Sequence, residues 1–125
     1  NMKQQGLALL MYAQDYDGHL PLKSPGWMNS IRPYTKNEEM LHCPSLRFDE
    51  YGYAFDARMA GKNQKKLKNP DTVLLLLEST NTQKNALSSG EGFAPRHNER
   101  GNIVFADGHA KSLRSEQRAD FNLKL

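Results

Sequence analysis

The chain has 125 residues, with 17 lysine and arginine against 14 aspartate and glutamate side chains, so its net charge is only +3. This length fits one small domain with a single core. The weak charge excludes the broad basic surface typical of nucleic-acid-binding proteins. Apolar runs such as VLLLL at 73–77 are too short for a membrane span or a signal peptide.

The first 16 residues are predicted to form an amphipathic helix, because their apolar positions recur at helical spacing. The predicted buried stripe contains Met2, Gly6, Leu9, Leu10 and Ala13, and Leu7 and Met11 widen it. Asp17-Gly18 and Pro21 end this helix. Because Trp27, Ile31 and Tyr34 share one helical face, a second and shorter helix is expected from Trp27 to Tyr34.

The rest of the chain reads as strands joined by polar loops. Strands are predicted at 51–55 (YGYAF), 72–79 (TVLLLLES), 102–106 (NIVFA) and 109–113 (HAKSL). The last two flank Asp107-Gly108, which favours a type I′ hairpin, in which Ala106 pairs with His109 and both face the same side. A long polar loop is expected at 83–101. The predicted fold class is therefore α+β, with the N-terminal helix on a three- to four-stranded antiparallel sheet.

Four side chains are candidate metal ligands: His97, Asp107, His109 and Glu78. Their types suit zinc or a related ion, although no tight spacing such as His-x-x-x-His supports the set. A metal-dependent binding or hydrolytic module centred on His97, Asp107 and His109 is one reading, and a structural histidine that bonds the loop is the other. No G-x-S-x-G elbow accompanies a His97–Asp107 acid–base pair, so we do not expect an enzyme.

Several other motifs are better read as structure than as sites. Asp15, Asp17 and Gly18 resemble fragments of a calcium loop, but the twelfth position is Gly26 where a Glu is required, so a helix-ending turn is favoured. The glycines at 90 and 92 are not followed by a helix, which argues against nucleotide binding. The four lysines between 62 and 68 are expected on a solvated loop. The single Cys43 excludes an internal disulfide.

The stretch RHNERGNIVFADGHAKSL resembles a known family. Its His97, nine residues, then Asp107-Gly108 match the signature of the bacterial prepilin-type processing-associated H-x(9)-D-G proteins, which are pilin-like and related to type II secretion pseudopilins. The likeness extends upstream through NMKQQGLALLMYAQDYDGHLP, SIRPYTKN, HCPS, YGYAF and NPDTVLLLLES, in order. The resemblance implies a pilin-like globular domain at 1–113, with 1–16 as the end of a longer helix, and a surface tail at 114–125.

That resemblance also implies a function and a location. The parent would be a structural or assembly subunit of a secretion or surface filament system, anchored in the inner membrane by a segment upstream of Asn1. Its globular domain would lie in the periplasm or outside the cell, within the cell envelope. The implied partners are other pilin-like subunits, the prepilin peptidase and the inner membrane, and not nucleic acid. A processing or sorting factor is suggested only by the family's name.

Two further expectations come from the resemblance. Family members often carry a cysteine just upstream of the position of Asn1, which would pair with Cys43 in an oxidising compartment. Related major pseudopilins bind calcium, so a calcium ion near Glu78, Asp107 or the loop from Gly90 to Arg100 is a hypothesis, and otherwise no cofactor is expected. No chemistry is implied for His97, Asp107 and Gly108, which are signature residues.

Overall fold

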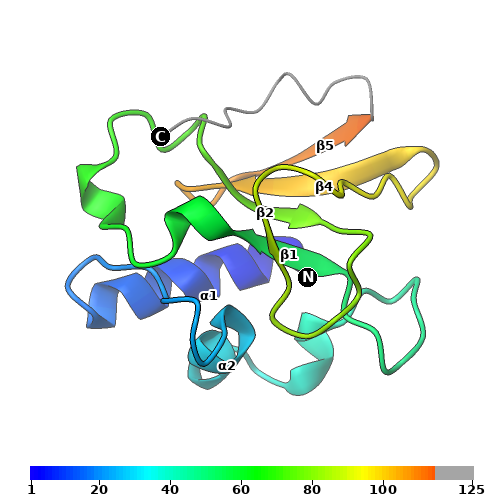
Figure 1. The fold of residues 1–125 in the computed structure, drawn as a ribbon, viewed down its shortest axis with the longest axis horizontal. Coiled ribbons are helices and arrows are strands. Elements are labelled where there is room, and N and C mark those ends of the chain that lie inside the picture. Colours follow the sequence, from blue (N-terminus) through cyan, green and yellow to red (C-terminus); the bar gives the residue numbers. More distant parts are fainter. Residues whose placement is uncertain (115–125) are drawn as a thin grey trace.

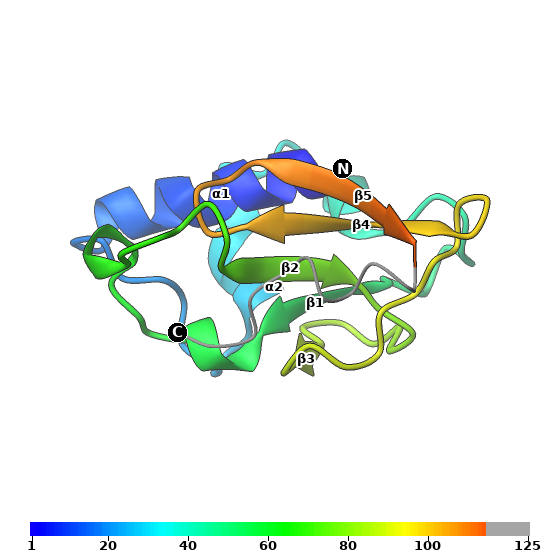
Figure 2. The same cartoon turned by 90° about the horizontal axis from the view of Figure 1, so that it is seen from above.

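Five strands form one mixed sheet in the computed structural model, which describes residues 1–114 (Figure 1). The strand order is β3-β1-β2-β4-β5, and Figure 2 shows the strands side by side. Their bounds are β1 Tyr53–Asp56, β2 Leu74–Glu78, β3 Leu87–Ser88, β4 Arg100–Phe105 and β5 Ala110–Arg114. The α+β class is confirmed. The sequence predicted three or four strands, all antiparallel. The observed sheet has five strands, and β3 pairs with β1 in parallel.

The helix α1, Met2–Asp15, lies against the sheet and contacts β4 most closely. Gly6 makes this approach possible, because a Cβ on it would lie 2.7 Å from Val104 Cγ1. Leu9 and Ala13 are buried as predicted. The prediction that Leu7 and Met11 widen the buried stripe is wrong, since they are 45% and 48% exposed. Both residues lie on the side of α1 that turns away from Leu9 and Ala13.

The second helix, α2, spans Trp27–Ile31 and continues as a 3₁₀ turn, η1, over Arg32–Tyr34. The change falls at Pro33, which has no N–H for a helical hydrogen bond. The indole Nε1–H of Trp27 donates to the carbonyl of Ala86 at 2.9 Å, which ties α2 to the segment before β3. Three further 3₁₀ turns are η2 Glu38–Leu41, η3 Ala57–Met59 and η4 Gln64–Lys66.

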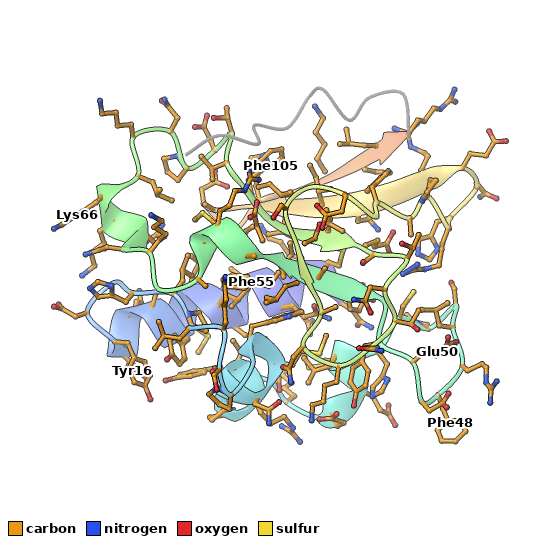
Figure 3. The ribbon with its side chains drawn as sticks, viewed as in Figure 1. Tyr16, Phe48, Glu50, Phe55, Lys66 and Phe105 are labelled. Carbon is orange, nitrogen blue, oxygen red and sulfur yellow. The ribbon has the colours of Figure 1, made fainter. Side chains whose placement is uncertain are left out.

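Apolar side chains cover both faces of the sheet, and a bulge in β2 decides which residues face which side. Figure 3 shows Phe55 on the side of the helices, where its ring lies 6.1 Å from that of Trp27, and Phe105 on the other side. Leu74 pairs with Phe105 and Leu76 with Val104, so one residue of β2 is extra. Such a bulge exchanges the faces of all residues that follow it.

The hairpin between β4 and β5 differs from the predicted one by one residue. Val104 pairs with Ala110, and the N–H of Phe105 donates to the carbonyl of His109. The loop is therefore Ala106, Asp107 and Gly108, a three-residue turn in which Gly108 has φ +94°. The predicted pairing of Ala106 with His109 is wrong, because the N–H of Ala106 instead donates to the carbonyl of Val73 and extends the contact with β2.

The segment 83–101 was predicted as loop, but it contains β3 and the start of β4. Within residues 1–114, no helix is both long and apolar enough to cross a membrane. The predicted tail at 114–125 begins inside β5, at Arg114, and its remaining residues, 115–125, lie outside the described part of the chain.

Candidate functional site

Glu78 is a buried carboxylate at the end of β2, with only 2% of the residue exposed. Its Oε1 lies 2.9 Å from Nε2 of His97, and its Oε2 accepts a hydrogen bond from the backbone N–H of Asn102 at 2.9 Å. A buried carboxylate without partners costs several kcal/mol, roughly, in desolvation. Both oxygens of Glu78 are therefore bonded, one by an ionisable side chain and one by the backbone of the neighbouring strand.

The bulge in β2 explains why Glu78 points to the side of the helices. Its cross-strand partner is Tyr53, which belongs to the buried cluster on that side. In regular alternation from Leu74, which lies on the opposite face, Glu78 would share that face. The extra residue reverses the alternation and brings the carboxylate to the helix side.

A tight turn at Asn98-Glu99 positions His97 just before β4, which begins at Arg100. The N–H and carbonyl groups of His97 and Arg100 bond each other at 2.8 and 3.0 Å, and the two residues between them have φ of 55° and 66°. Two positive φ values identify a type I′ turn, the geometry that we had predicted for Asp107-Gly108. The imidazole of His97 is 40% exposed, so solvent reaches the pair that it forms with Glu78.

Cys43 supplies a third chemically active side chain at this place. It follows η2, it is 1% exposed, and its N–H donates to the carbonyl of Tyr51 at 2.8 Å. A ligand atom from each of Cys43, Glu78 and His97 lies within 4.8 Å of the other two. Burial and, to a smaller extent, the neighbouring Cys43 and Glu78 raise the pKa of Tyr53, so that phenol stays protonated. We call Cys43, Glu78 and His97 the sheet-end cluster.

The guanidinium of Arg96 holds the backbone around the sheet-end cluster. Its two terminal nitrogens donate to the carbonyls of Ser79, at 2.9 Å, and Gly52, at 2.7 Å. These residues directly follow β2 and precede β1, so Arg96 links the ends of two strands next to Glu78. Its Nε is buried without a hydrogen-bond partner among the described residues.

The structure divides the four predicted metal ligands into two separate pairs. His97 meets Glu78 at one end of β4, and His109 meets Asp107 at the other end, where Nδ1 of His109 lies 2.6 Å from Oδ1 of Asp107. Asp107 and His109 therefore do not share a site with His97 and Glu78. The missed member of the cluster is Cys43, which the sequence analysis had considered only for a disulfide.

Asp107 and His109 form a local turn structure. Burial raises the pKa of Asp107, but hydrogen bonds from the backbone and ring of His109 outweigh it, and the net effect lowers that pKa. The imidazole of His109 stacks on Phe105 with ring centres 4.3 Å apart, which follows from their pairing in the three-residue hairpin. Gly108 abuts α1, since its carbonyl accepts a hydrogen bond from Nζ of Lys3 at 2.8 Å.

The chemistry available to the sheet-end cluster is that of a thiol, an imidazole and a carboxylate. These three donors are ligands of transition metals, and the thiol is also a nucleophile beside an imidazole base. Comparisons of the chain with family models, with curated proteins and with solved structures find no match. The structure therefore defines only the class of the protein, an α+β domain with three side chains at one end of its sheet that could hold a metal ion.

Proposed function

We propose that this chain is the globular domain of a pilin-like subunit, which acts by packing against further copies and not by turnover. The observation that carries the proposal is the outer face of α1, where Leu7 and Met11 are 45% and 48% exposed while the opposite face lies on the sheet. The order of the sequence segments that resemble the H-x(9)-D-G proteins supports the same proposal. Under this proposal the fold is pilin-like, with α1 as the end of a longer helix.

The outer face of α1 is suited to contact with another helix. Leu7 and Met11 are four residues apart, so their side chains are neighbours on the helix surface. Lys3 and Gln14 lie on the same side and are exposed, so polar residues border the apolar pair. Exposed apolar residues that adjoin one another mark protein contacts more often than single ones do. A second copy of α1 would bury both residues and leave their polar neighbours at the rim.

The remaining expectations from the resemblance belong to the same proposal. They are anchoring in the inner membrane through an upstream segment, a location in the cell envelope, and no catalytic activity. The alternative of a hydrolytic module centred on His97, Asp107 and His109 is not proposed, because the length of β4 separates Asp107 and His109 from His97. Calcium stays a prediction of the resemblance, and a calcium titration followed by melting temperature tests it.

Cysteine cross-linking in the full-length protein, expressed in its own cells, tests the packing proposal. We expect Leu7→Cys and Met11→Cys to form cross-linked multimers in the membrane fraction after mild oxidation. Lys66→Cys is the matched control, because Lys66 is also exposed but lies on η4, away from the outer face of α1 (Figure 3). Equal cross-linking at all three positions, or full-length protein that never enters the membrane fraction, would refute the proposal.

A further inference from the structure

We infer that the sheet-end cluster of Cys43, Glu78 and His97 binds one divalent ion of the zinc class. The inference does not depend on the proposed packing function. Three ligand types converge here from segments that are far apart in the sequence: the turn after η2, the end of β2 and the turn that leads into β4. Their ligand atoms lie within 4.8 Å of one another.

The spacing of the ligand atoms is close to that of a tetrahedral zinc site. Zinc bonds sulfur at about 2.3 Å and nitrogen or oxygen at about 2.0–2.2 Å, which places neighbouring ligand atoms roughly 3.3–3.8 Å apart in a tetrahedron. Nε2 of His97 and Oε1 of Glu78 are 2.9 Å apart, and the sulfur of Cys43 is within 4.8 Å of both residues' ligand atoms. A small movement of the His97 ring, whose side chain is 40% exposed, would adjust these distances to the tetrahedral spacing.

The chemical types of the three ligands determine which class of ion the site prefers. Calcium takes six to eight oxygen ligands, and this cluster has a single carboxylate. A thiolate and an imidazole together favour a softer ion such as Zn²⁺. The 40% exposure of the His97 side chain leaves one side open to solvent, so water can occupy the fourth position.

Neighbouring groups already orient the ligands. The N–H of Asn102 fixes Oε2 of Glu78, which leaves Oε1 directed at His97. Nδ1 of His97 lies 3.5 Å from Oγ of Ser45, so a proton on Nδ1 has an acceptor when Nε2 binds a metal. Such second contacts orient metal ligands in known sites, and their loss costs about 10- to 100-fold in affinity.

Binding requires a defined movement of protons. A carboxylate only accepts hydrogen bonds, so without metal Nε2 of His97 carries the proton that it shares with Glu78. When the ion binds, Nε2 must be free of its proton: an imidazolium releases that proton to solvent, and a neutral ring changes tautomer, so in both cases the bound ring carries one proton, on Nδ1. The thiol of Cys43 loses its proton to solvent and binds as thiolate. Affinity for the ion therefore falls as the pH is lowered, because protons compete for the sulfur and the imidazole.

Metal titration of the reduced, metal-free chain tests the inference. We expect one Zn²⁺ per chain, a higher melting temperature with Zn²⁺, and a thiolate-to-metal charge-transfer band when Co²⁺ replaces it. Cys43→Ser, Glu78→Gln and His97→Gln should each weaken Zn²⁺ binding at least about tenfold. His109→Gln is the matched control, since it removes the imidazole of the other acid–histidine pair, and it should bind Zn²⁺ as the unchanged chain does.

Two results of this titration would overturn the inference. One is a Co²⁺ complex of the unchanged chain without a thiolate band, a measurement that depends on no variant folding. The other is equal Zn²⁺ affinity in the unchanged chain and in the His97→Gln variant. Because His97 is partly exposed, this variant should fold normally, and an unaltered circular dichroism spectrum would verify that it does. The sulfur is also the one that the family resemblance pairs with an upstream cysteine. Cys43 found as a disulfide in the full-length protein from its own cells would likewise exclude the metal.

Discussion

His97 bonds Glu78 and not Asp107, although Asp107 is the residue that shares the sequence signature with it. Nε2 of His97 is 2.9 Å from Oε1 of Glu78, whereas the carboxylate of Asp107 is bonded by the ring of His109 at 2.6 Å. The spacing of nine residues between His97 and Asp107 is set by β4, whose two ends carry these two turns. The signature therefore marks the length of one strand and the turns that bound it.

Replacing Glu78 by alanine should destabilise the fold more than replacing it by glutamine. Glu78→Ala leaves the N–H of Asn102 and the ring of His97 without their acceptor in a buried place, and we expect a loss of about 2–3 kcal/mol in the free energy of unfolding. Glu78→Gln retains one acceptor oxygen for Asn102 and should lose about half as much. Urea unfolding measures both values. Glu39→Gln, at an exposed position, is the control, and a loss in Glu78→Ala no larger than in this control would contradict the prediction.

Much of the fold could be predicted from local patterns. The helical period before Asp15, the apolar run that forms β2 and the turn at Asp107-Gly108 each place an element within a residue or two of its observed bounds. β3 could not be predicted this way. It has two residues, Leu87 and Ser88, and it exists because Ala86 accepts hydrogen bonds from the indole of Trp27 and the N–H of Phe55. Those partners are distant in the sequence, so no local pattern indicates them.

Only part of the candidate site was predicted, because the register of β2 could not be predicted from the sequence. Glu78 and His97 were both named, but so were Asp107 and His109, because the four residue types are equally suitable as ligands. The bulge in β2 decides that Glu78 faces Cys43, and a bulge of one residue leaves no mark in a run of four leucines. The type I′ turn at Asn98-Glu99 was also missed, since glutamate is rare at positive φ.

The pair formed by Asp107 and His109 should make stability depend on pH in acid. The pKa of Asp107 is lowered below 3.8 in the fold, so its contribution is complete above that value and is lost as the pH falls through the folded pKa. Because both side chains are about a third or more exposed, we expect about 0.5 kcal/mol. Asp107→Asn should therefore be less stable than the unchanged chain near neutral pH, by urea unfolding, and the difference should shrink as the pH falls below 3.8. A difference that persists unchanged in acid would show that the charge of Asp107 is not its cause.

Gly6→Ala tests how closely α1 approaches β4. Alanine favours a helix over glycine by about 1 kcal/mol, so on a free helix this change would stabilise. Here the new Cβ would lie 2.7 Å from Cγ1 of Val104, and we expect a net loss of about 1–3 kcal/mol from overpacking. Gln4→Ala, on the exposed side of α1, is the control and should alter the free energy of unfolding by less than about 0.5 kcal/mol. Gly6→Ala should cost less when Val104 is also alanine, as a double-mutant cycle measures, and a Gly6→Ala variant more stable than the unchanged chain would contradict the prediction.

Glu99→Gly should stabilise the turn that presents His97. Glu99 has φ of 66°, and a left-handed conformation costs a residue with a Cβ roughly 1–2 kcal/mol. Asn-Gly is the preferred pair for a type I′ turn, and the substitution creates it at 98–99. The greater freedom of glycine in the unfolded chain offsets part of the gain, so we expect a net increase of about 0.5–1 kcal/mol in the free energy of unfolding.

The matched control for that change is Glu99→Ala, which removes the same exposed carboxylate but keeps a Cβ at positive φ. It should gain nothing, and the difference between the two variants isolates the backbone contribution from the charge. Because the hydrogen bonds between His97 and Arg100 close this turn, the gain should also slow hydrogen exchange at the amides of both residues. Equal stability of the glycine and alanine variants would mean that the backbone of Glu99 carries no strain in this turn.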